Sequence, residues 1–73
     1  MGVIRVRAVS SKIGYFWYLQ DLETEQYIKK GLLGFVRLVS QMNDATKWED
    51  VNKMVIWAKF KRTDIEFVDD MQQ

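Results

Sequence analysis

Four aromatic residues stand in a row in this chain, as Tyr15-Phe16-Trp17-Tyr18. Successive side chains of a strand point to opposite faces of a sheet, so the run places aromatic rings on both faces of one strand. In a chain of 73 residues, such rings are either buried on both sides or form an exposed surface that binds a partner. The run therefore predicts an aromatic strand near the centre of the fold and leaves both outcomes open.

Length and composition predict one small domain, spanning residues 1–73, with a thin core. The chain contains no cysteine and no histidine, which excludes disulfides and metal sites built from thiolate or imidazole ligands. Aromatic packing and oligomerisation remain as sources of stability. A fully buried large side chain contributes about 1.5–3 kcal/mol of transfer free energy.

No apolar run approaches the roughly 18–20 residues that cross a bilayer, and no signal-peptide pattern opens the chain. We therefore expect a cytoplasmic protein with no membrane partner. Its net charge is +1, but the charges are segregated. Residues 1–12 and 53–62 carry bases and no acid, whereas residues 64–70 carry acids and no base. Either these blocks pair across neighbouring elements, or they form a basic patch beside an acidic edge.

The N-terminal part favours strands joined by short turns. Residues 3–9 are β-branched and alternate, with Arg5 and Arg7 on the side opposite the aliphatic residues. A turn with Asp at its first position is expected at 21–24. The predicted strands cover residues 3–9, 15–21 and 25–30, and together they form a three-stranded antiparallel meander.

The remaining residues favour two helices and a last strand. Apolar residues spaced by four and three predict an amphipathic helix over 32–42. A capping box of Thr46 and Glu49 predicts a second helix from about residue 47. Residues 54–60 either continue that helix or form a strand, and we favour the helix because no breaking residue interrupts it before Thr63. Residues 64–68 form the final strand. The predicted fold class is α+β, an antiparallel sheet with two helices packed on one face. The expected core is Ile4, Val6, Leu19, Ile28, Leu32, Phe35, Val39, Val51, Val55 and Phe67.

Chemistry is restricted by what the chain lacks. Histidine and cysteine, the commonest general base and the most nucleophilic side chain near neutral pH, are both missing. No glycine-rich phosphate loop is present. Asp64 and Glu66 would share one face of a strand, but two alternating acids are usually solvated charge. We expect no enzyme, no cofactor and no metal.

A basic and aromatic sheet face suits single-stranded nucleic acid, because rings stack on bases while cations hold phosphates. Arg5 and Arg7 would be joined by either Phe16 and Tyr18 or Tyr15 and Trp17, according to register, and by Lys29 or Lys30. A helix-turn-helix arrangement of 32–42 and 47–60 is a weaker alternative, since acids occupy the first turn of its second helix. Aromatic and arginine side chains are also those enriched at protein interfaces.

The hairpin YFWYLQDLETEQYIKKG leading into LLGFVRLVSQM, in a short chain with no catalytic set, resembles small accessory proteins of bacteriophages, including anti-CRISPR and other anti-defence inhibitors. The resemblance implies stoichiometric binding without catalysis to a host protein or a protein–nucleic-acid complex, in the cytoplasm of the host cell. Many such inhibitors are strongly acidic DNA mimics, whereas this chain is near neutral and has only the acidic block at 64–70 to imitate phosphates.

The sequence thus predicts a binding protein that inhibits or modulates a host protein or protein–nucleic-acid complex, with single-stranded nucleic-acid binding as the alternative. A homodimer is also among the expected partners. The predicted contact residues are Arg5, Arg7, Tyr15 and Trp17 on the sheet face and Asp64, Glu66 and Asp69 on the acidic edge.

Overall fold

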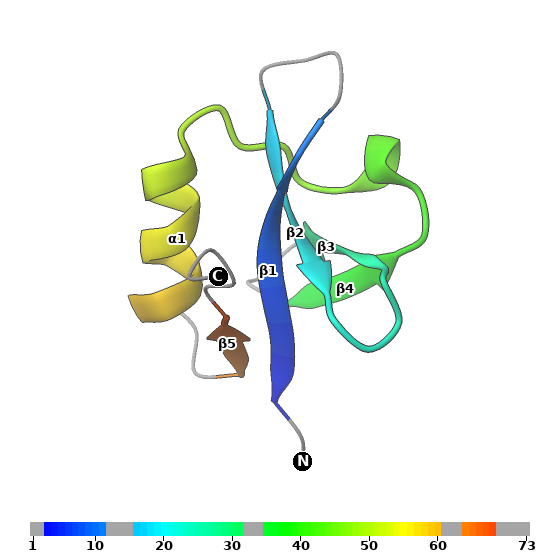
Figure 1. Ribbon diagram of the computed structural model, residues 1–73. Helices are drawn as coiled ribbons and strands as arrows, with labels where there is room; N and C mark the ends of the chain where they lie inside the picture. Colours follow the sequence, from blue (N-terminus) through cyan, green and yellow to red (C-terminus); the bar gives the residue numbers. More distant parts are fainter. Residues whose placement is uncertain (1–2, 12–15, 32–34, 61–63, 69–73) are drawn as a thin grey trace.

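A computed structural model describes residues 3–11, 16–31, 35–60 and 64–68. Within them, five strands form one curled sheet resembling half of a barrel, and one α-helix packs against it (Figure 1). The strand order across the sheet is β4-β3-β2-β1-β5. The elements are β1 (Ile4–Ser10), β2 (Trp17–Asp21), β3 (Tyr27–Lys30), β4 (Val36–Val39), the 3₁₀ helix η2 (Met42–Asp44), α1 (Val51–Phe60) and β5 (Ile65–Phe67).

The predicted fold class is wrong, because the described residues form a five-stranded mixed sheet with one α-helix instead of a three-stranded meander and a last strand with two helices. The antiparallel order of the first three strands does follow the prediction. Strand β1 pairs antiparallel with β2, and β2 pairs antiparallel with β3. The turn between β2 and β3 is held by Asp21, whose Oδ2 accepts hydrogen bonds from the backbone N–H and the hydroxyl of Thr24 at 3.0 and 2.6 Å. This is the role for which aspartate is favoured at the first position of a turn. The segment 12–15, predicted to contain a turn and Tyr15, lies outside the described residues.

The last strand corrects the prediction of an antiparallel sheet. Strand β5 runs parallel to β1, with Ile4 opposite Ile65 and Val6 opposite Phe67. A parallel pair needs a crossover that carries the chain back to the same end of the sheet, and α1 is part of that connection. Alternation along 64–68 nevertheless predicted the buried side correctly, since Ile65 is buried and Glu66 is exposed.

The predicted helix over 32–42 is wrong. Residues 36–39 form β4, which pairs antiparallel with β3 through four residues, and only a short 3₁₀ turn follows. The β-branched Val36 and Val39 fit a pleated strand better than a helix. Gly31 marks the corner of this β3–β4 hairpin, where its N–H donates to the carbonyl of Phe35 at 2.6 Å. A Cβ at Gly31 would lie 3.2 Å from that carbonyl oxygen, so the close approach favours glycine.

The second predicted helix exists but begins later, and the capping box is wrong. Helix α1 starts at Val51, and the Oδ1 of Asp50 accepts hydrogen bonds from the N–H groups of Asn52 and Lys53. Asp50 is therefore the N-cap. Thr46 is used elsewhere, because its hydroxyl oxygen accepts the backbone N–H of Lys30 at 2.8 Å. The interpretation of 54–60 as helix is confirmed. The helix-turn-helix alternative is wrong, because its first helix over 32–42 does not form and residues 36–39 are a strand.

The segment before α1 is tied to two strands at once. Trp48 and Trp17 exchange backbone hydrogen bonds of 3.0 and 2.7 Å, and the N–H of Thr46 donates to the carbonyl of Ile28 at 3.2 Å. Only Gln20 and Tyr27 form a ladder pair between β2 and β3. Residues 45–48 therefore satisfy the backbone of β2 and β3 where these strands no longer pair with each other.

The core lies between the sheet and α1. Its buried residues are Val6, Leu19, Ile28, Met54, Ala58 and Ile65. Three of the predicted core residues, Val6, Leu19 and Ile28, are buried, and Ile4, Val51 and Phe67 pack around them. Phe35 was predicted to be in the core but is 69% exposed, because it immediately precedes β4 instead of lying on a helix. Leu32 lies outside the described residues.

Candidate functional site

The sheet has two faces, defined by the pairing register. Residues opposite each other on neighbouring strands share a face. The helix face carries Val6, Leu19, Ile28 and Ile65 and packs on α1. The face that points away from α1 is called here the outer face. Its described residues are Arg5, Arg7, Val9, Tyr18, Gln20, Tyr27, Lys29, Arg37, Val39 and Glu66.

The outer face is basic, because Arg5, Arg7, Lys29 and Arg37 stand against the single carboxylate of Glu66 among its described residues. Lys29 and Arg37 lie directly opposite each other on β3 and β4. Like charges in that arrangement are destabilising. The described part of the chain places no carboxylate within ion-pairing distance of either side chain. The two cations therefore repel each other, with no carboxylate of the described residues close enough to offset the repulsion.

A hollow of about 530 Å³ opens beside this pair. It is lined by Lys29, Lys30, Gly31, Phe35 and Arg37. The ring of Phe35 is 69% exposed, so an apolar aromatic surface stands next to the cations of Lys29 and Arg37. This combination can hold an anionic group that carries a planar ring.

Arg7 lies in the middle of the outer face and is fixed there. Its Nε and Nη2 donate to the Oε1 of Gln20 at 3.1 and 3.0 Å, and the amide of Gln20 donates to the carbonyl of Glu25 at 3.1 Å. Beside them, Tyr18 and Tyr27 meet edge to face with ring centres 6.3 Å apart. These bonds hold the guanidinium in one orientation. Arg7 is therefore a preorganised cation on the outer face.

Arg5 on β1 forms an ion pair with Glu66 on β5. Their Nε and Oε1 atoms are 3.8 Å apart, with both side chains more than half exposed. Exposed pairs of this kind contribute about 0–1 kcal/mol, so the pair is easily exchanged for another ligand. Asp64 immediately precedes β5, and its carbonyl accepts the N–H of Ile4 at 3.1 Å.

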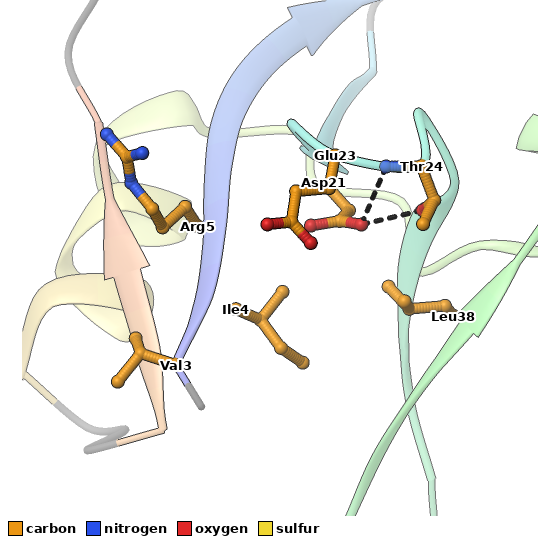
Figure 2. Close-up of a pocket in the computed structure, with 7 residues that line it drawn as sticks. All are labelled: Val3, Ile4, Arg5, Asp21, Glu23, Thr24 and Leu38. Atoms are coloured by element: carbon orange, nitrogen blue, oxygen red, sulfur yellow. Dashed lines mark hydrogen bonds between the residues drawn. The ribbon is translucent and has the colours of Figure 1, made fainter. Parts of the chain in front are cut away.

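A second, smaller hollow of about 290 Å³ lies near the start of β1 (Figure 2). Figure 2 shows the carboxylates of Asp21 and Glu23 directed toward the apolar side chains of Ile4 and Leu38. The carboxylate of Asp21 already accepts two hydrogen bonds from Thr24. This hollow therefore belongs to the turn between β2 and β3 and is the weaker candidate for a binding site.

The structure brings together only part of the predicted contact set. Arg5, Arg7 and Glu66 share the outer face. Trp17 points the other way, packs against the core on the helix face and is partly buried. Of the two registers left open by the sequence, the one that places Tyr18 beside the arginines is the one observed. Tyr15 and Asp69 lie outside the described residues.

Two residues of the hollow were missed by the sequence analysis. Arg37 was assigned to a helix and Phe35 to the core. The alternation of 36–39, with Val36 and Leu38 on one side and Arg37 on the other, is the signal that identifies this strand. The helical spacing of 28–42 concealed it, because that spacing includes Ile28 from the preceding strand.

No family model, curated protein or solved structure matches this chain. Among the described residues, no helix has the length and apolar character that crossing a membrane requires. The same residues contain no cluster of three or more Asp or Glu side chains arranged to hold a metal ion.

Proposed function

We propose that this protein is a non-enzymatic binding protein whose outer face binds single-stranded nucleic acid. The observation that carries the proposal is the like-charged pair of Lys29 and Arg37, opposite each other beside the exposed ring of Phe35. A bound phosphate would turn the repulsion between the two cations into attraction for a shared anion. The cytoplasm, where such strands occur, is the compartment we propose.

Geometry favours one phosphate between Lys29 and Arg37. Side chains directly opposite on antiparallel strands have Cβ atoms about 4.5–5.5 Å apart, so both head groups can reach the same anion. Arg37 can bind it with two parallel hydrogen bonds, whereas Lys29 supplies a point charge. Arg7 and Arg5 lie on the same face toward β5, beyond the buried side chains of Tyr18 and Gln20 on β2. They are further cations for the backbone of a strand held at Lys29 and Arg37.

The ring of Phe35 favours a single strand over a duplex. Bases in a duplex are stacked on one another, whereas an unpaired base offers its face to an aromatic side chain. Such stacking contributes about 1–3 kcal/mol per base and tolerates any sequence. We therefore propose binding with little sequence preference.

The experiment is fluorescence anisotropy of labelled single-stranded DNA and RNA oligonucleotides, with a duplex of equal length for comparison. Neutralising two to four phosphates gives an affinity that falls roughly 7-fold to 50-fold between 50 and 200 mM salt, because counterions are released with a slope near 0.7 per phosphate. The duplex should bind more weakly than either single strand.

Arg37→Gln tests the site, and Lys53→Gln on the exposed surface of α1 is its matched control. We expect Arg37→Gln to weaken binding about fivefold at 50 mM salt, which corresponds to about 1 kcal/mol. It should also raise the free energy of unfolding by a few tenths of a kcal/mol, since it removes the repulsion with Lys29. Absence of binding at 50 mM salt, or an equal loss in Lys53→Gln, would refute the proposal.

A second candidate function is stoichiometric binding to a protein partner, as the sequence first predicted. The side chains of Ile56 and Phe60, one turn apart on α1, are 48% and 76% exposed, and exposed apolar residues at this spacing favour a protein contact. In this case Phe60→Ser would abolish partner binding and leave oligonucleotide affinity unchanged.

A further inference from the structure

Two indole rings form an aromatic corner outside the proposed nucleic-acid site. Trp48 precedes α1 and Trp57 belongs to it, and their ring centres lie 5.6 Å apart with planes inclined at 44°. Both side chains are partly buried and pack against the core. The backbone of Trp48 is held by its two hydrogen bonds to Trp17. The corner is therefore a preformed surface rather than a pair of mobile side chains.

A cation already occupies this corner. The Nζ atom of Lys30 lies 4.4 Å from the centre of the Trp48 ring and 5.4 Å from that of Trp57. Both distances are within the roughly 6 Å over which a ring attracts a cation, and tryptophan is the strongest of the aromatic partners. The protein's own lysine thus serves as an internal ligand that identifies the chemistry of the site.

The side chain of Lys30 can move out of the aromatic corner. Its side chain is exposed, and no described carboxylate lies within ion-pairing distance of its ammonium. The same side chain lines the hollow that contains Lys29 and Arg37, whose positive charges disfavour its extension in that direction. The two indoles therefore hold an ammonium that has no carboxylate partner among the described residues. A cation that binds the indoles more strongly can therefore replace the ammonium of Lys30 at a small cost in free energy.

We propose that Trp48 and Trp57 form a binding site for a quaternary ammonium group, with Lys30 as its displaceable internal occupant. A primary ammonium is compact and strongly hydrated, so it loses hydration when it faces an aromatic ring. A quaternary ammonium has no N–H group to leave unsatisfied, and its methyl groups contact the rings directly. Choline and the side chain of trimethylated lysine both carry this group.

The experiment follows tryptophan emission while tetramethylammonium chloride is added at constant ionic strength, balanced with sodium chloride. Lys30→Met keeps the apolar stem and removes the charge, so the corner loses its internal competitor. We expect a saturable change in emission and an affinity at least fivefold higher in Lys30→Met than in the unaltered protein. Lys59→Met, the same substitution at a lysine whose ammonium lies over the ring of Phe67 at 5.7 Å instead of over the indoles, should bind as the unaltered protein does.

A neutral compound of the same shape separates charge recognition from apolar contact. 3,3-Dimethylbutanol should bind Lys30→Met at least tenfold more weakly than choline does. Parallel titrations with choline and with free trimethyllysine identify the preferred source of the group. Trp57→Leu should abolish the response if it folds, and the Lys30→Met result stands if it does not.

Two outcomes would overturn the proposal: no saturable response in Lys30→Met, or equal affinities for choline and its neutral analogue. Neither outcome depends on nucleic-acid binding, so this site and the outer face are tested separately.

Discussion

At the start of α1, the Oδ1 of Asp50 accepts hydrogen bonds from two backbone N–H groups of the first turn. The nitrogen–oxygen distance is 2.9 Å for Asn52 and 3.4 Å for Lys53. Glu49, one residue earlier, is equally exposed and equally charged, but no hydrogen bond is observed from its side chain to the helix. The difference is one of reach, because a cap must lie immediately before the first helical residue. A single carboxylate thus determines where the helix begins.

Asp50→Ala should lower the free energy of unfolding by about 1 kcal/mol, the usual contribution of an N-cap. Asp50→Asn should retain most of this contribution, since the amide oxygen also accepts a hydrogen bond. Urea denaturation followed by circular dichroism measures the change. Glu49→Ala is the control and should lie within about 0.5 kcal/mol of the unaltered protein; equal effects at the two positions would show that charge near the helix matters and the cap does not.

At the scale of elements, the connection 45–48 behaves as part of the sheet. It supplies backbone partners to Trp17 on β2 and to Ile28 on β3, and the hydroxyl of Thr46 supplies a further acceptor to Lys30. Unpaired backbone groups of a buried strand are costly. The connection removes that cost where β2 and β3 separate, and it also places Trp48 against Lys30.

Thr46→Val tests this function of the connection, because valine keeps the shape of threonine and removes the acceptor for the Lys30 N–H. We expect a loss of about 1 kcal/mol in the free energy of unfolding, as for a typical hydrogen bond. Amide hydrogen exchange should accelerate at Lys30 while the amides of Trp17 and Trp48 keep their protection. Unchanged exchange at Lys30 would contradict the assigned hydrogen bond.

At the scale of the whole molecule, β5 brings the two ends of the described chain together. Its pairing places Ile65 opposite Ile4, and α1 packs on both β5 and β2. The core is therefore completed only when the last strand has joined the first. Such long-range pairing must overcome the loop-closure entropy of most of the chain.

Ile65→Ala should destabilise the entire fold rather than one edge, because Ile65 is 5% exposed within the shared core. The expected cost is about 2–5 kcal/mol, and the smaller change Ile65→Val should cost about 0.5–1.5 kcal/mol. Tryptophan emission and circular dichroism should give the same shifted midpoint in denaturation. Glu66→Ala, the exposed neighbour, should cost no more than about 1 kcal/mol. If β5 unfolds before the other elements, tryptophan emission and circular dichroism will give different midpoints, which would contradict this expectation.

Local patterns predicted individual elements of this structure but not its fold class. The alternation in β1, the turn at Asp21 and the inward position of Ile65 all follow from side chains a few residues apart. The predicted helix over 32–42 is wrong because the spacing of its apolar residues is compatible with both a helix and a strand. The pairing of β4 with β3 favours the strand. Of the candidate site, Arg5 and Arg7 were found from alternation, and Lys29 was one of two alternatives on its strand. Arg37 and Phe35 were missed, because their places depend on that hairpin.

By itself, the sequence determined that β1 has one aliphatic and one basic side, that a turn forms at Asp21 and that no histidine or cysteine chemistry is available. These features depend on residue identity and on steric preferences within a few residues. Only the tertiary structure decided that Tyr18 and not Trp17 shares a face with the arginines, that β5 lies parallel to β1 and that Lys30 meets two indoles. Each of these depends on which distant backbone a strand pairs with, and pairing is decided by the free energy of the complete core.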